Sequence, residues 1–152
     1  MSDPIEFEGA TPRFSLPLLF AGQAQKEFFV NEALLRADLV LHGAIEGETQ
    51  TPPSAPAIGQ AWLVGPAPTG VFAGRPGVIA GWTGDGWRFV EPRDGLRVFD
   101  RGAQAFRLYS GGWRFAATPA APSGGATVDA EARATIVSIL ERLADAGVFA
   151  AS

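Results

Sequence analysis

Two short stretches decide the fold, GWTGDGWRFV at residues 81–90 and LYSGGWRFA at residues 108–116. Each has an aromatic and a hydroxyl residue, then a glycine-bearing turn, then Trp-Arg-Phe. The pairs Asp85-Gly86 and Gly111-Gly112 supply backbone positions that tolerate the positive φ of tight hairpin turns. Both stretches are therefore predicted to be β-hairpins.

Aromatic residues lie on both arms of each predicted hairpin. Trp82 and Trp87 are expected on neighbouring strands, as are Tyr109 and Trp113, where aromatic pairs contact each other. Within each Trp-Arg-Phe triplet, Trp and Phe share one face of the strand and Arg points to the other. Two copies are too few for a propeller or solenoid. The expected structure is a small antiparallel sheet or an open barrel of hairpins.

Glycine and proline positions divide the rest of the chain. Of the 19 glycines and 12 prolines, 25 residues lie between positions 43 and 125, and none lies in 23–42 or 126–146. The two empty windows predict helices, since Gly and Pro are the strongest breakers of regular structure. The order helix, β-segment, helix predicts an α+β fold.

The sequence predicts the secondary structure of the segments before the hairpins less strongly. Residues 11–20, TPRFSLPLLF, contain two prolines and are expected to be extended. Residues 46–56 are expected to form an irregular connection and residues 60–64 a strand. After a turn at 66–70, residues 71–73 are expected to pair back.

The first helix is predicted from about residue 22 to residue 42, with Gly43 as its C-terminal stop. Its apolar residues form two arcs. The broad arc contains Phe29, Val30, Ala33, Leu34, Ala37, Val40 and Leu41, and the narrow arc contains Ala24, Phe28, Leu35 and Leu39. A surface helix needs one apolar stripe. The second arc therefore meets either the β-segment or another subunit, and Phe28, Leu35 and Leu39 are candidate oligomer-interface residues.

The second helix is predicted over residues 128–146, with Thr127 as its N-cap and Gly147 as its terminator. Its apolar stripe contains Ala132, Ile136, Ile139, Leu140 and Leu143. A helix of this length is marginal alone. It either docks on its own domain or associates with copies of itself, and we favour self-association through Ile136, Ile139, Leu140 and Leu143.

These boundaries give four segments. Residues 1–12 form an N-terminal arm, 13–116 a helix plus small β-domain, 117–126 a flexible linker of Ala, Pro, Ser and Gly, and 127–152 a C-terminal oligomerisation helix.

Composition excludes several classes of protein. The chain has 152 residues, no cysteine, one histidine and a net charge of -4. Disulfide scaffolds, thiol catalysis and cysteine-based zinc sites are excluded. The acidic balance argues against nucleic acid as a partner. No apolar stretch approaches the roughly 20 residues that span a bilayer, and the N-terminus is not a secretory signal.

No motif for catalysis, metal or cofactor binding is present, so we expect neither an enzyme nor a cofactor. His42 is expected at a helix C-terminus, where the helix dipole favours it. Carboxylates cluster in the β-segment, and a glycosidase needs two of them. The cluster contains Asp85, Glu91, Asp94 and Asp100, but Asp85 and Asp94 precede glycine and are explained by turns.

Aromatic and arginine side chains concentrate in the hairpin region, with six arginines between residues 88 and 114. Three interpretations stay open: a packed sheet edged by arginines, a protein interface, and a surface that stacks on sugars and holds acidic groups. The candidate contact residues for the last two are Trp82, Trp87, Arg88, Tyr109, Trp113 and Arg114.

A family resemblance rests on three segments of the sequence: GQAQKE at residues 22–27, NEAL at 31–34, and the glycine- and tryptophan-rich stretch at 68–95. Over about residues 11–116 the chain closely resembles a domain-of-unknown-function family of bacterial prophages and gene-transfer agents. The resemblance implies a virion structural protein associated with head spikes or tail fibres. It supplies no catalytic residues.

We therefore expect a base, adaptor or fibre subunit of a head spike or tail fibre that takes part in host attachment. The expected partners are its own copies, as a trimer or pentamer, and capsid, spike or fibre proteins, without nucleic acid or membrane insertion. The protein is expected to be made in the bacterial cytoplasm without a signal peptide and to reside in the particle. The alternative is a carbohydrate-binding module for host capsule or surface polysaccharide.

Overall fold

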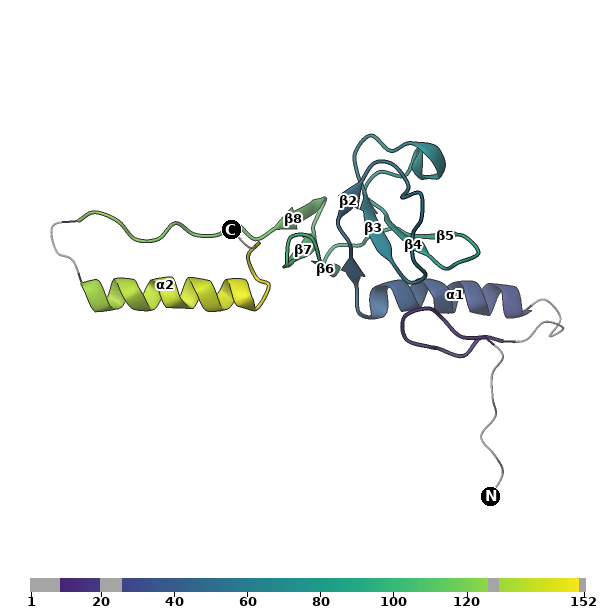
Figure 1. Ribbon diagram of the computed structural model, residues 1–152, viewed down its shortest axis with the longest axis horizontal. Helices are drawn as coiled ribbons and strands as arrows, with labels where there is room; N and C mark the ends of the chain where they lie inside the picture. Colours follow the sequence, from purple (N-terminus) through teal and green to yellow (C-terminus); the bar gives the residue numbers. More distant parts are fainter. Residues whose placement is uncertain (1–8, 20–25, 126–128, 151–152) are drawn as a thin grey trace, which may run out of the picture. The chain divides into compact units, whose positions relative to one another are not determined.

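The computed structural model describes residues 9–19, 26–125 and 129–150. Its helices and small sheets form an α+β fold, as predicted, and no barrel closes (Figure 1). The chain divides into two compact units, the first ending at Pro92 and the second beginning at Arg93. This division falls inside the β-domain that was predicted over residues 13–116.

The first unit contains one long helix and a small mixed sheet. The strands follow the order β2-β3-β4-β5, with β2 parallel to β3 and the other pairs antiparallel. The elements are α1 (Lys26–Leu41), β1 (Ala44–Ile45), β2 (Glu48–Thr49), β3 (Ala61–Val64), the short 3-10 helix η1 (Gly70–Phe72), β4 (Ile79–Trp82) and β5 (Trp87–Val90).

Strand β3 confirms the strand predicted at 60–64. Two neighbouring predictions are wrong. Residues 46–56 are not wholly irregular, because Glu48 and Thr49 pair with β3. Residues 71–73 do not pair back, because residues 70–72 close a 3-10 turn that buries Phe72 completely. Burial of one large ring therefore outweighs strand pairing at this position.

The hairpin of β4 and β5 is confirmed, and Trp82 and Trp87 are direct cross-strand partners. The turn differs in detail from the prediction. The positive φ, 96°, belongs to Gly84, whereas Gly86 is not in the positive-φ region. The Thr83 N–H donates to the Gly86 carbonyl at 3.1 Å, which closes this alternative turn.

The sheet of the first unit is covered on both faces. On one face a cluster forms around the ring of Phe72 and contains Val64, Val78 and Ala80, with Trp87 and Phe89 packed against it. On the other face α1 packs, and Leu39, 3% exposed, lies directly over Gly81. Two apolar layers thus hold the four strands between α1 and η1.

The second unit is an antiparallel meander followed by a helix. It contains β6 (Arg97–Asp100), β7 (Ala105–Tyr109), β8 (Trp113–Phe115) and α2 (Ala130–Asp145). The predicted second hairpin is confirmed, because Tyr109 and Trp113 are cross-strand partners. Gly111 has φ 63°, which agrees with the predicted turn chemistry.

Helix α2 begins later than predicted. Its N-cap is Asp129, whose carboxylate accepts from the Ala132 N–H at 2.8 Å. The predicted cap at Thr127 is therefore wrong, and Thr127 itself lies outside the described residues. A carboxylate is the better cap here because it also meets the positive end of the helix dipole.

The predicted end of α2 is confirmed. Gly147 adopts φ 71°, and the N–H groups of Gly147 and Val148 donate to the carbonyls of Ala144 and Leu143. This is the Schellman arrangement, which satisfies the last carbonyls of a helix. The Gly147 carbonyl then accepts from the N–H of Phe106 at 2.8 Å, which ties the helix end to the meander.

The stretch predicted as extended is a compact loop. The N–H groups of Ser15 and Leu16 donate back to Thr11, and Ala10 bridges to Pro17. The start of the first helix predicted at residues 22–25 lies outside the described residues. In the described part of the linker, residues 117–125, there is no helix or strand, as predicted. None of the described helices is long and apolar enough to cross a membrane.

Candidate interaction surface

Three tryptophans of the first unit and Phe72 gather on one face of its sheet. The ring of Trp87 lies at the centre, with ring centroids 4.9 Å from Phe72, 5.3 Å from Trp82 and 5.8 Å from Trp62. The rings meet at angles between 58° and 82°, and the three tryptophans are half-buried. This packing is the arrangement that aromatic side chains prefer in a core.

These angles bear on sugar binding. Stacking on sugar rings needs exposed, flat aromatic faces, so the carbohydrate alternative requires coplanar rings near Arg88 or Arg114. Trp82 and Trp87 are tilted by 58°, and Tyr109 and Trp113 by 68°. Neither pair forms a coplanar platform, so the geometry of the candidate aromatic pairs gives the carbohydrate interpretation no support.

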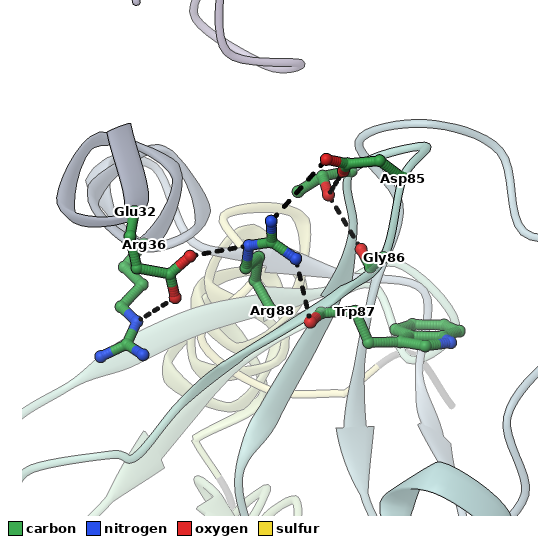
Figure 2. Close-up of polar contacts among 7 residues, drawn as sticks. Glu32, Arg36, Asp85, Gly86, Trp87 and Arg88 are labelled. Atoms are coloured by element: carbon green, nitrogen blue, oxygen red, sulfur yellow. Dashed lines mark hydrogen bonds and ion pairs between the residues drawn. The ribbon is translucent and has the colours of Figure 1, made fainter. Parts of the chain in front are cut away.

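Arg88 points away from the tryptophans, as the alternation of the Trp-Arg-Phe triplet predicted. Figure 2 shows its guanidinium between α1 and the hairpin turn. The Nε atom lies 2.9 Å from the Glu32 carboxylate, and Nη2 lies 3.8 Å from the Asp85 carboxylate. With a side chain 24% exposed, Arg88 joins α1 to the sheet. Its guanidinium thus has partners within the chain, and its candidate role as a ligand contact stays a prediction.

Asp85 belongs to the turn beside Arg88. The Thr83 hydroxyl donates to its carboxylate at 2.6 Å, and this hydrogen bond is the largest cause that holds the pKa of Asp85 below its ordinary value of 3.8. A carboxylate stabilised in its ionised form is a poor general acid at neutral pH. Asp85 therefore stabilises the hairpin turn.

The other candidate contact residues lie in the second unit. Tyr109 and Trp113 are half-buried, and Arg114 is exposed between Trp113 and Phe115 on β8. The six candidates thus separate into Trp82, Trp87 and Arg88 in the first unit and Tyr109, Trp113 and Arg114 in the second.

Several arginines stack on aromatic rings of their own unit. Arg75 lies 4.6 Å from the centroid of Phe89, Arg97 lies 4.6 Å from Phe106, and Arg107 lies 4.5 Å from Phe115. Such cation-π contacts are favourable at partly exposed positions. Much of the arginine and aromatic content that suggested a binding surface is therefore used inside the two units.

Two carboxylates of the cluster have hydrogen-bond partners within the second unit. Asp100 is buried and accepts from the Arg107 Nε at 2.8 Å and from the Ala103 N–H at 3.0 Å. Asp94 accepts from the Gly111 N–H at 2.9 Å. The Arg93 carbonyl accepts from the Leu96 N–H at 3.0 Å and Gly95 has φ 93°, so Asp94 lies in the turn that the sequence predicted. Its carboxylate contacts the next hairpin, and Asp100 has a structural role. Among the described residues, no three His, Cys, Asp or Glu side chains are grouped to hold a metal ion.

His42 lies just past the end of α1, where it was predicted. Its ring stacks on Phe14 with centroids 6.2 Å apart and an interplanar angle of 13°. Its carbonyl accepts from the Arg13 guanidinium at 2.8 Å. These contacts give the histidine a role in closing the helix end.

Sequence reasoning missed a polar cluster that fastens the N-terminal loop to α1. Asp38, 1% exposed, accepts three hydrogen bonds from that loop. The donors are the Thr11 hydroxyl at 2.6 Å and the N–H groups of Arg13 at 2.9 Å and Phe14 at 2.8 Å. We call Asp38 and its donors the Asp38 cluster. The available signal was Asp38 itself, an acidic residue between the apolar Ala37 and Leu39.

A second polar contact extends the same fastening. The Asn31 side chain accepts from the Leu19 N–H at 2.9 Å and donates to the Leu19 carbonyl at 3.0 Å. The Arg13 guanidinium also donates to the Leu39 carbonyl at 2.8 Å, which satisfies a helix-end acceptor. The loop therefore covers one side of α1 with backbone groups rather than with apolar side chains.

The narrow apolar arc of α1 is the one that packs inside the chain. Leu39 is buried on Gly81, contrary to its expected place at an oligomer interface, whereas Leu35 is half-buried and stays a candidate. Gly81 explains this choice, because the absence of a side chain lets the helix approach the strand closely. Of the three candidates on this helix, Phe28 stays exposed.

The broad apolar arc is the one left open. Phe29 is 74% exposed and Leu41 is 64% exposed, and Val30 and Ala33 are also exposed. Phe28 adds an edge-to-face contact with Phe29, at 5.7 Å between ring centroids. We call these five residues, Phe28, Phe29, Val30, Ala33 and Leu41, the open α1 face. Exposed apolar patches are commonly sites of contact with a protein, a membrane or a ligand.

Helix α2 has a second open apolar surface. None of its residues is buried, and Ile136 and Ile139 are exposed, the latter 53%. Leu140 and Leu143 are half-buried. All four predicted interface residues of this helix thus keep accessible surface, as an interface that awaits a partner requires.

Comparison with known families assigns the chain. The sequence model of a family described as "Protein of unknown function (DUF2793)" matches residues 30–114, which is more than half of the 152 residues. The chain belongs to the DUF2793 family. No curated protein and no solved structure matches it.

The DUF2793 match can be placed on the structure. It begins at Val30, inside α1, and ends at Arg114, inside β8. The match therefore includes Asp38, Gly81, the first hairpin, and the second hairpin as far as Arg114. The linker and α2 lie beyond the matched residues.

Proposed function

We propose that this chain is a non-catalytic structural subunit of a phage-like particle, a prophage or gene-transfer agent. In this role it is the base, adaptor or fibre subunit of a head spike or tail fibre, and it contributes to attachment at the host surface. Its partners are copies of itself and neighbouring capsid, spike or fibre proteins.

The observation that carries the proposal is the open α1 face. Four of its five residues, all but Phe28, lie on the broad arc of a helix whose narrow arc packs on the sheet through Leu39 and whose Asp38 fastens the N-terminal loop. A single exposed apolar side chain is ordinary, whereas a row of large ones on a well-placed helix favours a protein partner. The resemblance of the GQAQKE and NEAL segments to prophage and gene-transfer-agent proteins supports a particle as the place where that partner is found.

Purified particles provide the test. Particles produced by the source bacterium are isolated on a density gradient, the chain is detected by mass spectrometry, and it is located by cryo-electron microscopy. We expect the chain at a spike or fibre base, with the open α1 face against a neighbouring subunit. Particles that lack the chain would contradict the proposal.

Variants of the helix sharpen this test. The double substitution Phe29→Gln and Val30→Gln places polar side chains on the open α1 face and replaces no buried residue. It is expected to reduce incorporation into particles at least tenfold. Lys26→Gln with Arg36→Gln changes two exposed polar positions of the same helix and is the matched control. Equal incorporation of both variants would exclude this face as the contact.

A further inference from the structure

Helix α2 is well terminated but uncovered. Its 16 residues begin at the Asp129 cap and end in the Schellman arrangement at Gly147, yet none of them is buried. A single helix of about this length is marginal in water, and most helical stability in proteins comes from packing of an apolar face. The apolar side of α2 therefore requires a partner.

The spacing of the apolar residues says what kind of partner fits. Ala132, Ile136, Ile139 and Leu143 follow one another at intervals of four, three and four residues. This is the a/d repeat of a coiled coil, with Ala132 and Ile139 at d and Ile136 and Leu143 at a. Such a repeat is complementary to a second helix with the same repeat, and another copy of α2 has it.

We call the a and d residues, Ala132, Ile136, Ile139 and Leu143, the seam. Their identity indicates how many helices the bundle contains. Isoleucine at both a and d, or leucine at a with isoleucine at d, favours three or four strands over two. Both combinations occur here, in Ile136 with Ile139 and in Leu143 with Ile139. Leu140, next to the seam at an e position, widens the apolar stripe in the way that a bundle with two neighbours per helix can use.

Length and charge support the same arrangement. The helix is roughly 24 Å long, which is under three heptads. One partner helix would bury only the short row of a and d residues, whereas two partner helices would also bury the residues on either side of that row. In a parallel bundle the g position of one helix faces the following e position of its neighbour. Thr135 then faces Leu140, and since neither side chain is charged, no like charges meet in this pair.

We propose that α2 forms a parallel bundle with the α2 helices of at least two other copies of this chain. The proposal rests on the proposed function, because it assigns the self-association of the particle subunit to α2 and leaves the open α1 face to another protein. The Gly147 tie to Phe106 holds each meander at the same end of such a bundle. Closed cyclic symmetry then requires parallel helices when their number is three.

The test measures the mass of the full-length chain by light scattering coupled to gel filtration at micromolar concentration. We expect at least three times the single-chain mass of 15.9 kDa. Ile136→Gln with Ile139→Gln makes the seam polar with a residue that favours helix. This variant is expected to elute at the single-chain mass.

Ala134→Gln with Val137→Gln is the matched control, because it adds two glutamines to the same helix outside the seam. It is expected to keep the wild-type mass. Tryptophan fluorescence, which reports on the sheets, should be unchanged in both variants. A monomeric or dimeric wild type, or a seam variant that keeps the wild-type mass, would overturn the proposal.

The two proposals fail separately. A wild-type chain that forms the bundle in solution but is missing from purified particles contradicts the proposed function and leaves the bundle intact. A chain that is present in particles but monomeric in solution, with a seam variant that incorporates normally, contradicts the bundle alone.

Discussion

Helices α1 and α2 have the same length, 16 residues, and opposite surroundings. Helix α1 buries Asp38 and Leu39 and is held from two sides. Helix α2 buries no residue and is defined by its two caps. The comparison separates two ways in which this chain specifies a helix: tertiary contacts for α1 and terminal hydrogen bonds for α2.

The apolar sequence patterns alone would favour the opposite result, burial of α2 rather than of α1. Helix α2 has one clean stripe, which is typical of a helix that packs, whereas α1 has two arcs separated by polar residues. The helix with the less regular pattern is nevertheless the one that packs inside the chain. Apolar periodicity thus identifies a face that favours burial, but it does not say whether the same chain or another one covers it.

The largest expected effect in this comparison comes from Asp38→Ala. The substitution leaves three donors of the N-terminal loop, Thr11, Arg13 and Phe14, without their acceptor in a buried setting. Loss of a buried, charged hydrogen-bonding group costs about 3–5 kcal/mol. The free energy of unfolding, measured by denaturant titration with tryptophan fluorescence, should fall by this amount.

Arg36→Ala is the control for Asp38→Ala on the same helix. Its guanidinium pairs with Glu32 at 2.9 Å, but the side chain is more than half exposed. Exposed pairs of this kind contribute about 0.3–0.5 kcal/mol. If the two variants had similar unfolding free energies, the Asp38 cluster would not be what holds the loop on α1.

The next effect concerns the other side of α1. A Cβ at Gly81 would lie 2.8 Å from Leu39 Cδ1 and 3.0 Å from Leu39 Cγ, so Gly81→Ala forces the helix and strand apart. Overpacking of this kind costs about 1–3 kcal/mol. In a Leu39→Ala background the same change should cost less, because the clashing side chain is gone. Additive effects in this double-mutant cycle would show that the contact does not set the spacing.

Gly112→Ala is the matched control for Gly81→Ala. A Cβ at Gly112 meets no atom within 4 Å, and its φ is not positive. Its unfolding free energy should stay within about 0.5 kcal/mol of wild type. A larger loss would mean that glycine substitution in a hairpin is destabilising for reasons other than a clash.

Local sequence signals were enough to predict the hairpins. The turn glycines and the two-residue alternation placed Trp82 opposite Trp87 and Tyr109 opposite Trp113, and the register confirms both pairs. They also predicted that Arg88 would leave the tryptophan face. These features depend on residues close together in the chain, where turn chemistry sets the register.

Contacts between distant residues were not predictable in the same way. The Asp38 cluster joins positions 24 to 27 residues apart, and the donors include backbone N–H groups that carry no sequence signal. The choice between the two arcs of α1 depended on one distant glycine, Gly81, which was interpreted as part of a strand. The candidate contact surface was predicted from composition, which counts aromatic residues and arginines without showing which of them pack on each other.

The smallest expected effect concerns α2, the helix that buries no residue. Asp129→Ala removes the side chain that accepts from the Ala132 N–H at 2.8 Å, and loss of an N-cap costs about 1 kcal/mol of helix stability. Helix content from circular dichroism should fall, whereas the unfolding midpoint reported by tryptophan fluorescence should stay constant, because no residue of α2 is buried. Asp129→Ser supplies another good cap and should restore the helix signal. A midpoint that shifted together with the helix signal would mean that α2 is stabilised by the sheets after all, and the contrast with α1 would disappear.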